Sequence, residues 1–268
     1  QDYVRSKYIK IMIHKTAIIS ATAKVGKQVC IGPYCVIGDE VTIGDRSIID
    51  SHVVIKGPTI IGQDNHIYSF SSIGDDPQDK KYNNEKTSLF IGNGNTIREY
   101  CTINRGTLQD SGKTIIGDHN WIMAYVHIAH DCVVGNNIVF ANNATLAGHV
   151  SVGDWAIFGG FTGAHQYTRI GAHSFIGMNT LTTKDIPAYV MAEGQPIKPR
   201  GVNVEGLKRR GFSSKQILNI KKAYRVLYRK ELKLNEAIQE ITKLSSNHEE
   251  LKVLLNSLRS TSDRGIIR

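Results

Sequence analysis

Residues 31–44 read IGPYCVIGDEVTIG, which places an aliphatic residue followed by glycine at every sixth position. The six-residue spacing of aliphatic residues holds from Ile13 to Ile73. This period matches neither the 3.6 residues of an α-helix nor the two residues of a simple strand. It is the hexapeptide pattern of a parallel β-helix.

The hexapeptide pattern is interrupted twice by polar segments and then resumes. Because Ile91 stands three hexads after Ile73, we expect the polar run between them to form an outward loop near residues 75–90 that keeps the frame. A second outward loop is expected near residues 106–113. The pattern then continues over residues 116–176.

Three hexads form one triangular coil, so residues eighteen apart are expected to be vertical neighbours about 4.8 Å apart. Small residues four positions after the aliphatic one also point inward, which predicts buried thiols at Cys35, Cys101 and Cys132. The repeat therefore predicts an all-β fold, a parallel β-helix over residues 12–200.

The cysteine pattern points to a reducing compartment. The four cysteines are neither closely paired nor arranged as CxxC, and no signal peptide or membrane-spanning apolar run is visible. We therefore expect a cytoplasmic protein with no stable membrane insertion. Residues 1–11 precede Met12 and carry no repeat, so we interpret them as a tag or an unstructured extension.

The last quarter of the chain changes to a helical period. The expected segments are a connection at 195–204, a helix capped by Ser213 or Ser214, and further helices at 234–244 and 248–258. Residues 201–268 therefore predict a small α-helical domain packed on the end of the prism.

The chain is basic, with 33 Lys and Arg against 24 Asp and Glu. Between Leu207 and Lys233 many cations are accompanied by a single acidic residue, Glu231. A solvated helix face is one explanation. Binding of nucleic acid is not expected, because stacking aromatics and recognition motifs are absent. An acidic protein or a phosphorylated small molecule is the expected partner.

The segment HIAHDC at 127–132 is the richest in reactive side chains. The eighteen-residue coil places Gly148 beside His130, and it places His149 beside Asp131. We therefore expect one patch on neighbouring coils that contains His127, His130, Asp131, Gly148, His149, His165 and Gln166.

Two chemistries use such a patch. Histidines can ligate a metal ion that activates water, as in the carbonic anhydrases built from hexapeptides. Alternatively, neutral His130 takes a proton from a hydroxyl nucleophile, with Asp131 to orient it and the N–H of Gly148 to stabilise an oxyanion. The residues alone leave both chemistries open.

Three segments carry a resemblance to a known family. They are HIAHDC at 127–132, ANNATLAGHV at 141–150 and GVNVEGLKRRG at 201–211. Together they closely resemble the UDP-N-acetylglucosamine 3-O-acyltransferases of lipid A synthesis, over residues 12–268. The resemblance implies a left-handed β-helix, a handedness that the usual crossover rule would not suggest.

The resemblance also implies a reaction. In that family acyl carrier protein delivers an (R)-3-hydroxyacyl thioester to the 3-hydroxyl of UDP-N-acetylglucosamine, at active sites between the subunits of a homotrimer. Carried over, His130 is the general base, Asp131 its orienting neighbour and Gly148 the oxyanion donor. No metal and no cofactor beyond the carrier's phosphopantetheine is implied. The implied substrate-binding residues are Asp79, Lys81, His127, His149, His165, Gln166, Asn203, Glu205, Arg209 and Arg210.

Some positions depart from the family pattern. Asn104 stands where a histidine is frequent, and Gln195-Pro196 stands where Asn-His is common. The resemblance implies that Met178 occupies the position that limits acyl-chain length in the family. Because Met178 follows His130 by nearly three coils, roughly 13 Å of rise, we expect an acyl group shorter than fourteen carbons. The rival interpretation remains a metal-dependent hydratase of the carbonic anhydrase type.

Overall fold

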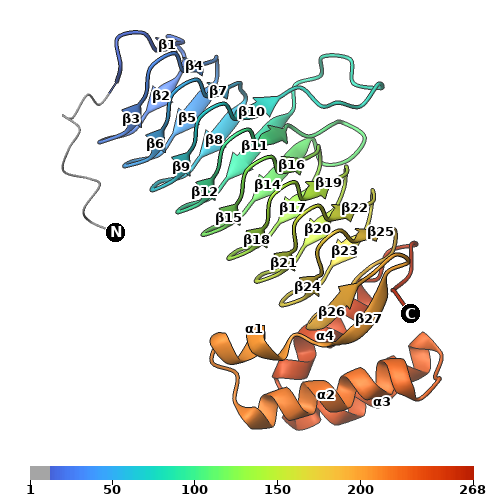
Figure 1. Ribbon diagram of the computed structural model, residues 1–268. Helices are drawn as coiled ribbons and strands as arrows, with labels where there is room; N and C mark the ends of the chain where they lie inside the picture. The colour runs from blue at the N-terminus through green and yellow to red at the C-terminus, as the bar shows by residue number, and fades with distance from the viewer. Residues whose placement is uncertain (1–12) are drawn as a thin grey trace.

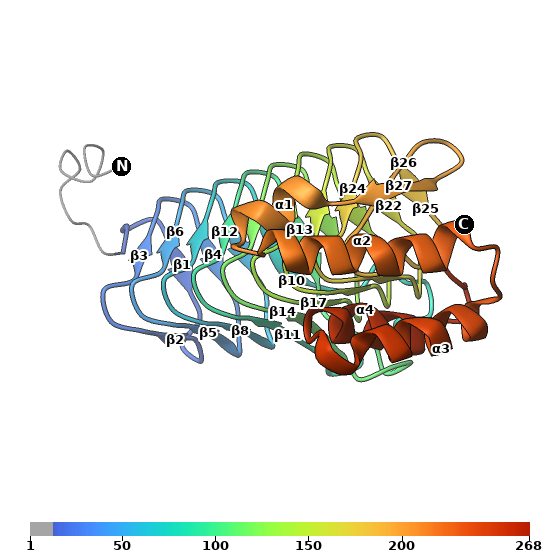
Figure 2. The ribbon, with the colours of Figure 1, turned by 90° about the horizontal axis from the view of Figure 1, so that it is seen from below.

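The computed structural model describes residues 13–268, and the tag or extension expected at residues 1–11 lies outside them. The chain forms a left-handed parallel β-helix with three sides, followed by helices at its C-terminal end (Figure 1). Figure 2, seen from below, shows the coils as a regular series of rungs. The predicted fold class is confirmed.

Each coil adds one short strand to each side, and within residues 13–268 we number the three sheets in chain order. Sheet 1 contains β1 (Ile18–Ile19), β4 (Val36–Ile37), β7 (Val54–Ile55), β10 (Ser72–Asp75), β13 (Thr102–Asn104), β16 (His127–Ile128), β19 (Thr145–Leu146), β22 (Gly163–Ala164) and β25 (Leu181–Thr182). Sheet 2 contains β2 (Lys24–Val25), β5 (Val41–Ile43), β8 (Thr59–Ile61), β11 (Ser88–Ile91), β14 (Lys113–Ile116), β17 (Val133–Val134), β20 (Ser151–Val152) and β23 (Arg169–Ile170). Sheet 3 contains β3 (Cys30–Ile31), β6 (Ile48–Ile49), β9 (His66–Ile67), β12 (Thr96–Ile97), β15 (Trp121–Ile122), β18 (Val139–Phe140), β21 (Ile157–Phe158), β24 (Phe175–Ile176), β26 (Val190–Glu193) and β27 (Lys198–Val202).

The chain passes from sheet 1 to sheet 2, then to sheet 3, and back to sheet 1. We call the three corners the 1/2 edge, the 2/3 edge and the 3/1 edge. Many corners turn through a non-glycine residue in the left-handed backbone region, such as Asp131 at φ 58° and His149 at φ 63° on the 1/2 edge. Such residues seldom adopt a positive φ, so the strands on either side must hold these turns in place.

The hexapeptide positions form a buried aliphatic column along the axis. Parallel pairing stacks them directly, as Ile37 pairs with Ile55. The thiols of Cys35, Cys101 and Cys132 are fully buried in the same interior, as predicted. Burial raises the pKa of Cys101 and Cys132 to about 12, so these two thiols serve as packing groups.

Both outward loops leave the prism at the 1/2 edge and on the same side (Figure 1). The first consists of residues 76–87, so residues 88–90, which were expected in the loop, instead belong to β11. The second consists of residues 105–112, and Lys113 begins β14. In both places strand pairing with the neighbouring coil extends further than the polar composition suggests.

The six-residue frame is kept across the first loop, because the 30 residues from Ile61 to Ile91 are five hexads, but the eighteen-residue coil is not kept there. Ile91 pairs with Ile61, its neighbour on the coil before, across a separation of 30 residues rather than eighteen. Across the second loop His127 pairs with Thr102, which is 25 residues earlier. The loops are therefore insertions into complete coils and do not replace hexads.

The helical part follows a hairpin at the end of sheet 3. β26 and β27 are antiparallel, so the expected connection at 195–204 contains a strand and the start of a helix. Ser213 caps the second helix, as predicted, with its side chain accepting from the N–H of Gln216. The helices are α1 (Val204–Arg209), α2 (Ser214–Arg229), α3 (Leu234–Leu244), the 3-10 turn η1 (Ser245–Asn247) and α4 (Glu250–Arg259).

The C-terminal tail returns to the prism. Ile266 forms a β-bridge with Asp185, and the Asp185 carboxylate accepts from the N–H of Ser262 at 2.6 Å and from its hydroxyl at 2.8 Å. The expected helical domain at 201–268 therefore begins inside β27 and ends against the last coil. None of the helices in the described residues is long and apolar enough to cross a membrane.

Two neighbouring valines test the inward column. Val134 is 2% exposed and Val133 is 46% exposed on the outer face of sheet 2. We predict that Val134→Ala lowers the free energy of unfolding by about 2 kcal/mol. The same change at Val133 should cost less than about 1 kcal/mol. Chemical denaturation of both variants measures the difference, and equal losses would contradict the assignment of faces.

Candidate active site

The candidate site is built on the 1/2 edge, where the chain turns from β16 to β17. His130 and Asp131 are adjacent in this turn and are buried, with 6% and 4% of their surfaces exposed. Nδ1 of His130 lies 2.8 Å from Oδ2 of Asp131. If Nδ1–H donates to the carboxylate, the other ring nitrogen, Nε2, is left as an acceptor for a proton.

Asp131 is held by the second outward loop. The N–H of Thr107 donates to both carboxylate oxygens, at 2.9 and 3.0 Å, and its hydroxyl donates to Oδ2 at 2.7 Å. Burial by itself would raise the pKa of Asp131, but hydrogen bonds from His130 and Thr107 bring that pKa below its usual value. The carboxylate is therefore an anion fixed in position beneath the imidazole.

Gly148 lies against His130 on the next coil. A Cβ atom added at Gly148 would stand 2.5 Å from Cε1 of His130, so no larger residue fits without moving the ring. The N–H of His149 donates to the carbonyl of His130 at 3.1 Å, which fixes the two coils in register. Among the described residues the N–H of Gly148 has no hydrogen-bond partner, so it can donate to a bound ligand.

His149 forms a second layer of the site. Its ring stands edge-on to His130, with centroids 5.1 Å apart, and stacks on Tyr167 at 4.4 Å. Its Nδ1 lies 3.1 Å from Oδ2 of Asp110 in the second loop. A groove of about 820 Å³ borders this layer, and its lining includes Asp110, Asp131, His149, Tyr167, Arg169 and Arg264.

The other predicted histidines lie at two depths. His127 is on the outer face of sheet 1, with Nδ1 2.7 Å from the hydroxyl of Thr102. Burial lowers the pKa of His127, and the neighbouring His130 lowers it further, so the ring favours its neutral form. His165 and Gln166 are exposed on the coil beyond Gly148.

Asp79 and Lys81 lie on the first outward loop. The carboxylate of Asp79 accepts the N–H of Lys81 at 3.0 Å and the side-chain amide of Gln109 at 3.0 Å. The bond from Lys81 is the main cause of a lowered pKa at Asp79, and the charge of His130 contributes to it. The first loop therefore carries an anion and a cation on the side of the dyad.

The predicted nucleotide contacts lie on another edge of the prism. They are Asn203, Glu205, Arg209 and Arg210. Asn203 caps α1 and donates to the carbonyl of His173 at 3.0 Å, on the 2/3 edge. Arg210 donates to Nδ1 of His173 at 3.2 Å and lies over the ring of Trp155. Burial, and then the charge of Arg210, lower the pKa of His173 to about 4, so its ring can accept this bond.

Met178 does not lie in line with His130. It follows β24 on the 3/1 edge, while His130 is on the 1/2 edge, so the face of sheet 1 separates them. The expected rise of nearly three coils is therefore not the path of a chain between the two residues. Met178 is 74% exposed and lies beside Gly160, whose added Cβ would be 4.0 Å from Cγ of Met178.

The dyad and His149 also form a possible ligand set for a metal ion. One nitrogen or oxygen atom from each of His130, Asp131 and His149 lies within 4.8 Å of the others. However, Oδ2 of Asp131 already accepts from the N–H and hydroxyl of Thr107 and from His130. The donor set therefore fits an orienting carboxylate better than a metal ligand, and the absence of a metal stays a prediction.

Sequence reasoning missed the loop residues that hold the site. These are Thr107, which binds Asp131, and Gln109 and Asp110, which contact Asp79 and His149. The available signal was the position of the second interruption, one coil before the HIAHDC turn and on the same edge. Because an insertion at an edge lies against the next turn of that edge, its polar residues were candidates.

Gly148 gives a test of the geometry that needs no substrate. We predict that Gly148→Ala displaces the imidazole of His130 and breaks its bond to Asp131, while the fold is retained because φ is not positive there. Nuclear magnetic resonance titration of His130 would detect the change. Gly201→Ala is the matched control, because nothing lies within 4 Å of its Cβ position. An unchanged His130 titration in the Gly148 variant would contradict the contact.

Family models match both parts of the chain. The model of the bacterial transferase hexapeptide repeat matches residues 22–57 and 113–148. The model described as Udp N-acetylglucosamine O-acyltransferase, domain 2, matches residues 185–267. The first model thus matches two stretches of the β-helix, and the second matches the end of the chain with its helices.

Similar proteins span almost the whole chain. The acyl-[acyl-carrier-protein]--UDP-N-acetylglucosamine O-acyltransferase of Thiobacillus denitrificans is 56% identical over 256 residues, with 96% of this chain and 99% of that protein covered. The UDP-N-acetylglucosamine O-acyltransferase structure from Moraxella catarrhalis has a TM-score of 0.95 at 46% identity, covering 96% of this chain and 100% of that one. The UDP-N-acetylglucosamine acyltransferase structure from Francisella novicida has a TM-score of 0.94 at 42% identity, covering 96% and 94%. With its hexapeptide coils and its helical part both matched, this chain is an acyltransferase and belongs to the UDP-N-acetylglucosamine O-acyltransferase family.

Proposed function

We propose that this enzyme transfers an (R)-3-hydroxyacyl group from acyl carrier protein to the 3-hydroxyl of UDP-N-acetylglucosamine, in lipid A synthesis. The names of its relatives supply the donor and the acceptor. The observation that carries the mechanism is the buried His130–Asp131 pair, which leaves Nε2 of His130 as a base. The free cysteines fit a reducing compartment, and we place the reaction in the cytoplasm.

In the first step Nε2 of His130 accepts the proton of the sugar hydroxyl, and the oxygen attacks the thioester carbonyl carbon. Asp131 stabilises the imidazolium that forms, because its carboxylate is kept charged by Thr107. Proton transfer by a positioned imidazole typically contributes about 10² to 10⁴ in rate. The dyad therefore supplies a base of the required kind without a cofactor.

The second step is collapse of the tetrahedral intermediate. Its oxyanion can accept from the unpartnered N–H of Gly148, which lies against the His130 ring. The carbon–sulfur bond breaks, and the imidazolium returns its proton to the leaving thiolate. Base and acid are then the same residue, which ends the cycle in its starting protonation state.

Binding of the nucleotide sugar requires residues from two edges. Asp79, Lys81, His127, His149, His165 and Gln166 belong to the 1/2 edge or its neighbouring face, whereas Asn203, Glu205, Arg209 and Arg210 belong to the 2/3 edge. One ligand can contact both sets if a second copy of the chain presents its 2/3 edge to the dyad. This supports a homotrimer with active sites between subunits.

Acyl carrier protein is acidic, and α2 offers it a basic face. The helix contains no acidic residue, and none of its exposed cations forms an ion pair within the described residues. These cations are Lys215, Lys221, Lys222, Arg225 and Arg229. Opposite charge of this kind speeds encounter with a partner more than it adds to affinity.

His130→Ala tests the proposed base. We predict that turnover falls by about a hundredfold or more while the trimer persists, because the substitution removes only the proton acceptor. Turnover of hydroxyacyl carrier protein with UDP-N-acetylglucosamine is the measurement. Wild-type turnover should survive treatment with a chelator, and its loss would favour the metal-dependent alternative.

Met178→Gly tests the proposed limit on chain length. Met178 is exposed on the 3/1 edge beside Gly160, and the proposal requires that the acyl chain lie along this edge. We predict that the wild-type enzyme prefers donors shorter than fourteen carbons, and that the variant shifts toward longer ones. A series of hydroxyacyl carrier proteins of graded length measures both preferences. Faster wild-type turnover of the fourteen-carbon donor would contradict the proposal.

A further inference from the structure

Arg105 is a buried arginine at the start of the second outward loop. Its side chain is only 8% exposed, and its ion-pair partner is Asp76 at the start of the first loop. Its Nη1 donates to the carbonyl of Gly74 at 2.5 Å. Its Nη2 also donates to the hydroxyl of Tyr82 at 3.2 Å. One guanidinium therefore contacts the first loop at two residues, Asp76 and Tyr82, and contacts β10 at Gly74.

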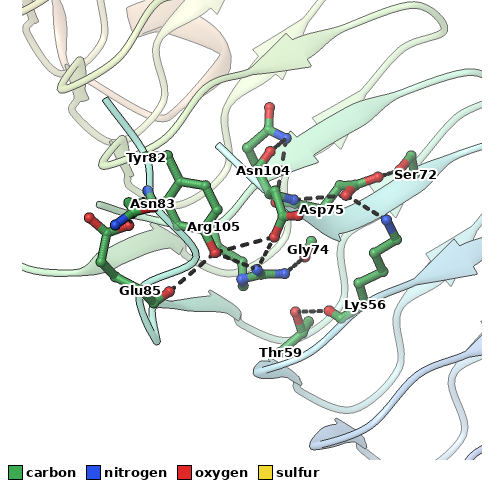
Figure 3. A network of polar contacts seen from close by, with 11 residues as sticks. Lys56, Thr59, Ser72, Gly74, Asp75, Tyr82, Asn83, Glu85, Asn104 and Arg105 are labelled. Atoms are coloured by element: carbon green, nitrogen blue, oxygen red, sulfur yellow. Dashed lines mark hydrogen bonds and ion pairs between the residues drawn. The ribbon is translucent and has the colours of Figure 1, made fainter. Parts of the chain in front are cut away.

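Tyr82 connects the guanidinium of Arg105 to the far end of the first loop. Its hydroxyl lies 3.3 Å from Oδ1 of Asp76. It also lies 3.1 Å from the carbonyl of Glu85, and Figure 3 shows Tyr82 between Arg105 and Glu85. Asn104, next to Arg105, donates to the carbonyl of Asp76 at 2.7 Å. The loop is thus tied at its beginning and near its end to one two-residue segment.

Residues 105–107 connect these contacts with the first loop to the catalytic dyad. Arg105, Gly106 and Thr107 are all buried, and Thr107 makes the three hydrogen bonds that hold Asp131. Gly106 fits only as glycine, because an added Cβ would be 2.2 Å from the N of Lys113. Arg105 therefore holds the first loop, and Thr107, two residues later, holds Asp131 of the dyad.

A further contact joins the two outward loops at a greater distance from the prism. Gln109, in the same loop as Arg105, donates to Asp79 at 3.0 Å. Asp79 and Lys81 are the loop residues that our proposed function assigns to the sugar and its phosphates. The distance between these groups and the base therefore depends on how the second loop holds the first.

We propose that Arg105 is a positioning residue that fixes the first loop, and with it Asp79 and Lys81, relative to the His130–Asp131 dyad. The inference rests on the proposed function only for the identity of the sugar nucleotide. Arginine suits the task because its planar fork can donate to a carboxylate, a carbonyl and a hydroxyl at once, whereas the ammonium of lysine cannot span them.

The contacts of Arg105 and those of Thr107 should affect different kinetic parameters. Loss of the Arg105 contacts should weaken substrate binding, so Arg105→Gln should raise KM for UDP-N-acetylglucosamine by about tenfold or more and change kcat by less than about threefold. Thr107→Val removes a bond to Asp131 instead. It should lower kcat by about tenfold and leave KM within about twofold.

Loop order can be measured without turnover. Lys80 and Lys81 are exposed in the first loop, so trypsin can cut there when the loop opens. We expect Arg105→Gln to speed this cleavage by about tenfold and Arg105→Lys to give an intermediate rate. Tyr82→Phe is the milder variant if Arg105→Gln does not fold. Arg46→Gln is the matched control, since it breaks an arginine–aspartate pair on the 2/3 edge.

Unchanged tryptic cleavage and unchanged KM in both Arg105→Gln and Tyr82→Phe would overturn the inference. Faster cleavage in the Arg46 variant would also overturn it, because the effect would then not belong to this contact. Asp79→Ala separates the two proposals. If Asp79→Ala leaves KM unchanged while Arg105→Gln speeds cleavage, the loop is positioned as inferred but the proposed substrate contact fails.

Discussion

Parallel pairing of strands only two to four residues long holds this molecule together, and every other feature depends on that ladder. Such short strands offer few hydrogen bonds each, so the coil is stable only because apolar side chains of the hexads stack inward. The strands in turn hold the corners in left-handed backbone geometry. Asp131 and His149 occupy two such corners, so the ladder that stabilises the fold also orients the reactive groups.

The corners divide the proposed functional groups among three edges. The dyad and both outward loops belong to the 1/2 edge, Arg210 and its partner His173 to the 2/3 edge, and Met178 to the 3/1 edge. A prism of this kind cannot bring its own three edges together. We propose that the reaction uses groups from all three edges, and this proposal places the active site where one prism meets another.

The period of the sequence predicted the fold, the buried thiols and the contact of Gly148 with His130, because each follows from counting residues along a regular coil. Counting failed wherever the coil is irregular. It assigned the residues of the first loop to positions within a coil, although the pairing of Ile91 with Ile61 shows that they are inserted. It also placed Met178 in line with His130, although Met178 lies on another edge. The roles of Arg105 and Thr107 depend on how side chains pack between two insertions, which no periodicity encodes.

The contact of the C-terminal tail with the last coil has a consequence for aggregation. A parallel β-helix ends in unpaired strands that can accept a strand from another molecule and grow end to end. Here the β26–β27 hairpin ends sheet 3, and the bridge between Asp185 and Ile266 covers the last coil. The C-terminal part of the chain, which contains the helices, therefore covers this end of the β-helix. It prevents other molecules from adding strands there and forming fibres.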